Sequence, residues 1–359
     1  MSNYWSKIAR NLDPYVPGEQ PKDRQYIKLN TNENPYPPSA QVISAIHSAT
    51  NEDLKLYPDP NGEALRRAIA SRFELSADQV FLGNGSDEVL AFTFLAFFDP
   101  GRSILFPDIT YSFYPVYANL FHIPYRCVPL NEDFTLPVSE FRGDNHGVIF
   151  PNPNAPTGNA IAAQAVEEIL RHNQEHVVVI DEAYIAFGGE SAVPLIRRYP
   201  NLLVIHTLSK SHSLAGLRVG FAMGDPELIR ALETIKNSVN SYTLDRLALA
   251  GAEAAIKDTA YYQGTKIKIM RTRAHVVSEL EKMGFTVIPS QANFIFIRHP
   301  VQDAAELFRQ LKEHGILVRY FPKPRIDQFL RVSIGNDAEM AAFLRTVSGL
   351  SIPYGPAPH

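Results

Sequence analysis

The chain has 359 residues, of which 45% are hydrophobic and 20% are charged, and its net charge is −4. It has no basic run, so neither a nucleic-acid-binding protein nor a membrane-surface protein is indicated. The longest apolar run, near Val89–Phe98, has about half the length that a membrane span needs. The N-terminal residues lack the apolar segment of a signal peptide, and the single cysteine, Cys127, excludes an internal disulfide. We therefore expect a cytoplasmic globular enzyme with about two domains.

Short apolar runs alternate with amphipathic stretches from about Gln41 onward, a pattern typical of an α/β fold with a mostly parallel sheet. The preceding residues look irregular and are rich in Pro, Asn and Tyr. Nearly continuous apolar runs predict a seven-stranded sheet, with strands at Gln79–Leu82, Ser103–Phe106, Tyr125–Pro129, Gly147–Phe150, Val177–Ile180, Leu202–His206 and Arg218–Met223. Helices are predicted at Glu63–Arg72, Asp87–Phe98, Ala163–His172 and Pro226–Ile235.

A long helical region is predicted at Leu244–Met283, and a smaller α/β domain follows it. The predicted elements of this domain are strands Thr286–Ile288, Asn293–Arg298, Leu317–Tyr320 and Leu330–Ser333 and helices Gln302–His314 and Ala338–Val347. We expect residues 1–40 to form an arm that packs on the small domain or on a partner subunit. Residues 41–250 would form the large domain and residues 251–359 the small one, with a boundary that falls inside a helix.

Polar clusters follow several of the predicted strands, at the sheet edge where open α/β folds bind ligands. Gly83–Glu88 precedes a helix whose free N–H groups would suit a phosphate, although a glycine turn capped by Ser86 or Asp87 also explains it. Pro151–Gly158 has three prolines and two asparagines, which suits a rigid loop that points a donor at a ligand. Taken alone, this second cluster is most simply a turn before a helix.

Two further clusters carry charge. Asp181 ends an apolar strand, so it needs a cationic partner, either a ligand or a structural ion pair. Lys210 follows another apolar strand, where a lowered pKa would make it a nucleophile; the alternative is an exposed loop lysine. Arg218 could return a guanidinium to the same phosphate. Together, the four clusters supply the phosphate cradle, asparagine donor, carboxylate and amine that pyridoxal phosphate requires.

The order of these motifs, G-N-G-S-D-E, N-P-N-A-P-T-G, D-E-A-Y and S-K-x-x-x-L-A-G-L-R, resembles that of the fold-type I pyridoxal-phosphate aminotransferases. Within that class, Lys28–Pro35, Tyr57–Asp59 and Leu330–Gly335 resemble the histidinol-phosphate aminotransferases. The resemblance implies a homodimer in which glutamate donates its amino group, leaving 2-oxoglutarate, and imidazole-acetol phosphate becomes histidinol phosphate in histidine synthesis. Aromatic aminotransferases and a threonine-phosphate decarboxylase share these motifs and remain alternatives. A regulatory cofactor-binding domain is disfavoured because the chain has no basic arm.

The resemblance also implies roles for individual residues. Lys210 would form the Schiff base with the cofactor and later move the substrate proton. Asp181 would pair with the pyridine nitrogen, and Tyr184 would donate to the ring oxygen. Tyr111 would stack on the ring, and Tyr57 would reach the phosphate of the partner subunit's cofactor. The residues expected to hold the cofactor phosphate within one subunit are Gly85, Ser86, Asp87, Ser209 and Arg218.

The substrate's anionic end would meet Arg331 and Arg319, and Tyr15 would close over it by the same resemblance. The chain departs from the family at Ala155, where an asparagine normally precedes Pro-Thr-Gly, so Asn154 is the expected amide donor instead. His212, inside the lysine loop, is expected to be structural. His172 and His176 have metal-ligand spacing but no evident third ligand, so no metal is expected.

Overall fold

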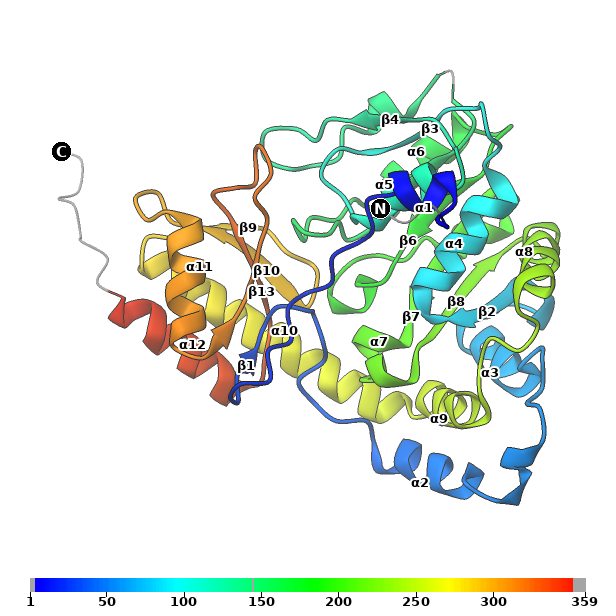
Figure 1. Ribbon diagram of the computed structural model, residues 1–359, viewed down its shortest axis with the longest axis horizontal. Coiled ribbons are helices and arrows are strands. Elements are labelled where there is room, and N and C mark those ends of the chain that lie inside the picture. Colours follow the sequence, from blue (N-terminus) through cyan, green and yellow to red (C-terminus); the bar gives the residue numbers. More distant parts are fainter. Residues whose placement is uncertain (1–3, 144, 351–359) are drawn as a thin grey trace.

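The computed structural model describes residues 4–143 and 145–350. Figure 1 shows a larger part, built on one sheet, beside a smaller part with a sheet of its own. Each part has its own hydrophobic core. The structure therefore confirms the predicted α/β class with a seven-stranded, mostly parallel sheet.

The large sheet has the strand order β2-β8-β7-β6-β5-β3-β4. All neighbouring strands are parallel except β8, which is antiparallel to both β2 and β7. All seven predicted strands are present, with ends shifted by only one or two residues. They are β2 Val80–Asn84, β3 Ile104–Pro107, β4 Tyr125–Val128, β5 Val148–Pro151, β6 Val178–Asp181, β7 Leu202–Thr207 and β8 Val219–Gly224.

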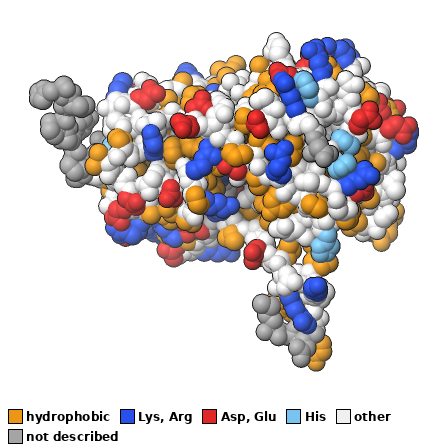
Figure 2. All heavy atoms as spheres, turned by 90° about the horizontal axis from the view of Figure 1, so that it is seen from above, with side chains coloured by type: hydrophobic (Ala, Val, Ile, Leu, Met, Phe, Trp, Pro, Cys, Tyr) orange, Lys and Arg blue, Asp and Glu red, His pale blue; other side chains and the backbone are white. Residues whose placement is uncertain are grey.

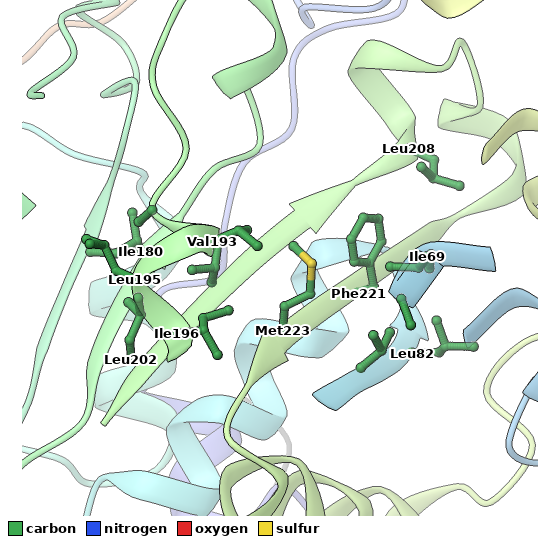
Figure 3. Packing of buried hydrophobic residues seen from close by; sticks show 14 of the residues in the cluster. Ile69, Leu82, Ile180, Val193, Leu195, Ile196, Leu202, Leu208, Phe221 and Met223 are labelled. Carbon is green, nitrogen blue, oxygen red and sulfur yellow. The ribbon is translucent and has the colours of Figure 1, made fainter. Parts of the chain in front are cut away.

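Helices cover both faces of this sheet, which explains why the strands are apolar throughout. Along β6, for example, Val178 and Ile180 point into one core and Val179 points into the other. Figure 3 shows the first core, where Ile69 and Leu82 lie beside Phe221. Helices α3 Glu63–Phe73, α6 Ala163–Arg171 and α9 Arg246–Lys257 pack on this face, whereas α4 Gly85–Phe97, α5 Phe113–Leu120 and α8 Pro226–Val239 pack on the opposite face.

The predicted long helical region is two helices, α9 and α10 (Thr259–Lys282), that meet at Asp258. This aspartate ends α9, and its side chain accepts from Tyr261 N to cap α10. Helix α10 runs from the large part to the small one in Figure 1. The small part contains β9 Thr286–Ile288, β10 Phe294–Arg298, β11 Ile316–Leu317, β12 Arg319–Tyr320, β13 Leu330–Ser333, α11 Ala304–Glu313 and α12 Asp337–Gly349.

The single strand predicted at Leu317–Tyr320 is two short strands with different partners. Strand β12 belongs to an antiparallel sheet of order β12-β13-β10-β9. Strand β11 instead pairs in parallel with β1 (Ile27–Lys28), and the next arm residue, Leu29, packs in the small core. The division of the chain at residues 40 and 250 stays a prediction, and residue 250 lies within α9.

No helix is predicted from the sequence before Glu63, yet the structure describes two there, α1 (Lys7–Asn11) and α2 (Ala40–Ala49). Helix α2 begins where the side chain of Ser39 accepts from Val42 N, a polar cap that follows two prolines. Helix α1 has no buried residue, and the N-terminal segment that contains it projects from the body in Figure 2. Short 3-10 turns lie at Glu52–Lys55, Ala77–Gln79, Val138–Phe141, Ile185–Phe187, Val193–Arg197 and Ala215–Leu217. Among the residues described, no helix combines the length and hydropathy needed to cross a bilayer.

Candidate functional site

A cavity of ≈ 300 Å³ lies at the edge of the large sheet, where β5, β6 and β7 end, and the arm and the small part close its other side. Most of the residues singled out from the sequence meet there. Those that line the cavity are Tyr15, Ser86, Asp87, Tyr111, Asp181, Tyr184, Ser209, Lys210, Arg218, Arg319 and Arg331. The carboxyl ends of the parallel strands bring together residues that are far apart in the sequence, as the strand pattern predicts.

Lys210 lies on α7 (Leu208–Ser211), a single turn that follows β7. Thr207 begins this turn, because its Oγ1 accepts from Ser209 N at 3.1 Å. The Lys210 Nζ donates to the carbonyl oxygen of Thr31, 2.9 Å away. Burial, with the nearby charge of Arg331, lowers the pKa of Lys210 from 10.5 to about 8. A larger fraction of this amine is therefore neutral near pH 7 than for an exposed lysine, as a nucleophile requires.

Asp181 is buried at the end of β6, with 4% of its surface exposed. Its carboxylate accepts from Ala183 N at 3.1 Å and from the Tyr114 hydroxyl at 3.2 Å. No cationic side chain of the described residues forms an ion pair with it, and burial raises its pKa from 3.8 to about 6. Such a carboxylate is suited to a cationic ligand, because a positive charge would offset the cost of burying the negative one.

Next to Asp181 in the sequence, Glu182 contacts a histidine instead of the cavity. Glu182 is buried, with 1% exposed, and its Oε2 lies 2.7 Å from His206 Nε2. Ser191 Oγ and Ala192 N also donate to this carboxylate. Of these two consecutive acids, Asp181 therefore lines the cavity, whereas the carboxylate of Glu182 is bound by protein groups.

The N-terminus of α4 and Arg218 form a corner suited to a phosphate. No side chain caps α4, so its first N–H groups remain available to an anion. Gly85 has a φ of 76°, and a Cβ there would overlap the Arg218 guanidinium. Gly220 on β8 was not singled out from the sequence, yet a Cβ there would overlap the backbone of Gly85 and Ser86. Both glycines thus let two backbones and a guanidinium approach closely.

Asp87 contributes to this corner through its side chain as well as its position in the first turn of α4. One carboxylate oxygen accepts from the Tyr111 hydroxyl at 2.7 Å, and the other accepts from the Arg218 guanidinium at 3.0 Å. From the sequence, Asp87 is expected to contribute mainly its backbone N–H group to phosphate binding. The two hydrogen bonds orient the Tyr111 ring at the cavity wall and hold Arg218 beside the helix end.

Two arginines from the small part line the opposite end of the cavity. Arg331 donates to Asn30 O at 2.9 Å, and Arg319 donates to Val16 O and Pro17 O. Neither forms an ion pair with a carboxylate among the described residues, so their charge is available to an anion. Tyr15 lies near them and stacks its ring on Phe113, with ring centroids 4.3 Å apart.

Three predicted site residues do not line the cavity of their own chain: Gly85, which lies against the Arg218 guanidinium at its corner, Tyr57 and Asn154. Tyr57 is 78% exposed and stacks on Tyr242, which fits neither a buried core position nor a site within this subunit. Asn154 Nδ2 is used elsewhere, since it donates to Ile109 O and to Thr157 Oγ1. Ala155, at the position where the family has its asparagine, lines the cavity, whereas the expected donor Asn154 does not.

The arm also supplies lining residues for which no role is predicted from the sequence, among them Asn30, Thr31, Asn32 and Glu33. The polar run before Pro35 marked them only as part of a family motif. Their position depends on the pairing of β1 with β11, a contact between residues 289 positions apart that no local pattern reveals.

His212 is structural in this arrangement, as expected. Its ring stacks on Tyr262, its Nδ1 lies 2.8 Å from Ser211 Oγ, and burial lowers its pKa to about 3. Within residues 4–143 and 145–350, no three His, Cys, Asp or Glu side chains are grouped as metal ligands would be.

This fold and this set of side chains define a class: the chain belongs to the class I and II aminotransferase family, whose model matches residues 24–347. The particular branch follows from its relatives. The chain is 58% identical to the histidinol-phosphate aminotransferase of Clostridium acetobutylicum, over 96% of this chain and 98% of that protein. It is 54% identical to histidinol-phosphate aminotransferase 1 of Oceanobacillus iheyensis, over 98% and 99% of the two chains. The chain is thus a member of the histidinol-phosphate aminotransferase group.

Solved structures agree on the fold. A crystal structure of a histidinol-phosphate aminotransferase from C. acetobutylicum matches with a TM-score of 0.84 at 26% identity, covering 90% of this chain and 98% of that one. The enzyme of the same name from Sinorhizobium meliloti, solved in complex with pyridoxal-5'-phosphate, matches with a TM-score of 0.86 at 23% identity, covering 98% and 99%.

Proposed function

We propose that this chain uses pyridoxal phosphate to exchange an amino group between histidinol phosphate and 2-oxoglutarate, with glutamate and imidazole-acetol phosphate as the other pair. The observation that carries the proposal is the meeting of three features at one cavity. A lysine of lowered pKa, a buried carboxylate without a cationic partner, and an uncapped helix end beside Arg218 all face it.

The residues present fit the cofactor. The corner formed by Gly85, Ser86, Asp87, Ser209 and Arg218 would hold its phosphate. Asp181 would pair with the protonated ring nitrogen, whose positive charge would offset the effect of burial that raises the pKa of this carboxyl. Tyr111 would lie against the ring, and Tyr184 would donate to the ring oxygen.

When bound, pyridoxal phosphate supplies an electron sink that lets the substrate's α-carbon lose a proton. Lys210 Nζ, in its neutral form, would bind the cofactor's carbonyl carbon and, once released, would accept that proton from the substrate α-carbon. The carbonyl of Thr31 gives the released ammonium a place to donate, 2.9 Å from Nζ.

The free charges of Arg319 and Arg331 support a substrate with an anionic end, because a guanidinium can bind phosphate or carboxylate through paired hydrogen bonds. Histidinol phosphate would present its phosphate here, and glutamate its distal carboxylate, in the two half-reactions. A second chamber of ≈ 280 Å³ adjoins the cavity at Arg331 and extends beside Phe321 and Ile326. Its size gives space beyond the reacting atoms for the remainder of a substrate.

We further propose that the protein is a homodimer in the cytoplasm. Tyr57 is exposed and absent from the cavity of its own chain, which supports a homodimer in which it reaches the cofactor phosphate of the other subunit. Sedimentation of wild type and Tyr57→Phe, with cofactor titrations, would test this: we expect both to be dimeric and the variant to bind the cofactor more weakly. A cytoplasmic location remains the expectation for this enzyme.

A half-reaction tests the substrate assignment. The cofactor-loaded protein is mixed separately with histidinol phosphate, phenylalanine or threonine phosphate, without an oxo acid, while the visible band and carbon dioxide are followed. Loss of the band at the lowest concentration with histidinol phosphate supports the proposal. A faster loss with phenylalanine would make the chain an aromatic aminotransferase, and carbon dioxide from threonine phosphate would make it a decarboxylase.

A further inference from the structure

We propose that Asn32, on the N-terminal arm, is a positioning residue that directs the hydroxyl hydrogen of Tyr184 into the cavity. The Asn32 Nδ2 donates to Tyr184 Oη over 3.0 Å. Both residues line the cavity, together with Lys210. The inference rests on the proposed function, because the ring oxygen of pyridoxal phosphate would receive the hydrogen.

The orientation of the Asn32 amide is fixed by the small part. Ser333 Oγ, on β13, donates to Asn32 Oδ1 at 3.0 Å and accepts from Asn32 N at 2.8 Å. Asn293 Nδ2 donates to Asn32 O at 2.9 Å. With Oδ1 accepting from Ser333, the Nδ2 group faces Tyr184. Asn32 also has a φ of 56°, a conformation that asparagine tolerates better than most residues.

The hydrogen bond from Asn32 determines where the Tyr184 hydroxyl can point. A phenol has one hydrogen and two lone pairs, and Asn32 occupies a lone pair. Among the described residues, no protein group accepts the hydrogen of Tyr184, so it is left for a ligand in the cavity. Burial raises the pKa of Tyr184, which keeps the hydroxyl protonated, whereas the bond from Asn32 acts in the opposite direction and makes it a stronger donor.

Tyr184 carries this role without help from the neighbouring loop. Ala155 lines the cavity but brings no polar side-chain atom, and the Nδ2 of Asn154 donates to Ile109 O and Thr157 Oγ1. A change in the direction of the Tyr184 hydroxyl should therefore weaken its hydrogen bond to a bound ring oxygen, with no donor from this loop to replace it. Asn32 compensates for the missing amide by acting through Tyr184.

The substitution Asn32→Asp separates this role from simple packing. Aspartate has nearly the same shape and can still accept from Ser333 Oγ. Its second oxygen accepts rather than donates, however, so the Tyr184 hydrogen would turn toward residue 32 and away from the cavity. Ser333→Ala is the milder second variant, because it leaves Asn32 in place but removes the hydrogen bond that fixes its amide.

The readout is the pH midpoint of the visible band after pyridoxal phosphate is added to each purified protein. A donor on the ring oxygen favours the deprotonated form of the bound cofactor, so its loss moves the midpoint upward. We expect Tyr184→Phe and Asn32→Asp to raise the midpoint by about one pH unit each, the equivalent of one hydrogen bond to a charged group. Ser333→Ala should raise it less.

The double variant Ser333→Ala/Tyr184→Phe decides the mechanism, because neither substitution adds a charge near the cofactor site. If Asn32 acts through Tyr184, the double variant shows no larger shift than Tyr184→Phe alone. The control is Asn173→Asp, an equally buried asparagine whose Nδ2 donates to Phe141 O and Ile169 O, away from the cavity; its midpoint should match wild type.

Three results would overturn the inference: unchanged midpoints in folded Asn32→Asp, unchanged midpoints in Ser333→Ala, or shifts that add in the double variant. Circular dichroism identifies any variant that has not folded, and Ser333→Ala then gives the answer. A wild-type protein that develops no visible band would instead refute the proposed function, so the two failures are distinguishable.

Discussion

Replacing Asp181 with asparagine should stabilise the cofactor-free protein. Burial raises the pKa of Asp181 from 3.8 to about 6, so folding disfavours its ionised form. At pH 7 the difference of about two units corresponds to about 3 kcal/mol at 1.36 kcal/mol per unit. Asparagine removes this cost and keeps the contacts, since its Oδ1 can accept from Ala183 N and its amide can donate to the Tyr114 oxygen.

The pH dependence gives the sign of this effect. Because the folded-state pKa is raised, ionisation of Asp181 lowers the free energy of unfolding. This loss is absent below pH 3.8, grows as the pH rises, and is complete once the pH has passed 6. The advantage of Asp181→Asn should therefore fall from about 3 kcal/mol at pH 7 to about 1.5 kcal/mol at pH 5. Urea denaturation of both cofactor-free proteins at the two pH values measures it. A variant less stable than wild type at pH 7, or an advantage independent of pH, would show that ionised Asp181 does not destabilise the folded protein.

Four further substitutions test the rest of the site. Lys210→Ala should abolish both the visible band of added pyridoxal phosphate and turnover, as absorption and product assays would show. Gly85→Ala should weaken cofactor binding at least about tenfold in a fluorescence titration, because the positive φ is strained and the new Cβ would displace Arg218. Arg331→Ala should raise KM for histidinol phosphate by about 10- to 150-fold, the loss expected for hydrogen bonds to a charged group, and raise KM for phenylalanine less. Tyr57→Phe should weaken cofactor binding although Tyr57 lies outside its own cavity, and equal affinities would argue against a shared site.

The large sheet could be predicted because its signal is local. Runs such as Val177–Ile180 and Leu202–His206 are apolar throughout, which in a chain of this length indicates strands covered on both faces. Their ends then identified Asp181 and Lys210, which the structure brings to one cavity. The site roles of these residues stay predictions until the variants are measured.

Long-range pairing explains the features that the sequence did not reveal. The division of Leu317–Tyr320 into two strands follows from the pairing of β11 with the arm, and residues of the arm such as Asn32 enter the cavity for the same reason. Helix α2 is not among the predicted elements, although its cap at Ser39 is a recognisable local signal. The side chain of Asn154 is directed by hydrogen bonds to Ile109 and Thr157, which a loop sequence does not specify.

The proposed function depends above all on Lys210 as the residue that binds pyridoxal phosphate covalently. The most direct test is to add pyridoxal phosphate to the full chain, reduce the complex with borohydride, digest it and map the modified lysine by mass spectrometry. We expect one cofactor mass per chain, on the peptide that contains Lys210, and none on Lys210→Ala treated in the same way. Stoichiometric modification of another lysine, or equal labelling of the Lys210→Ala protein, would contradict it.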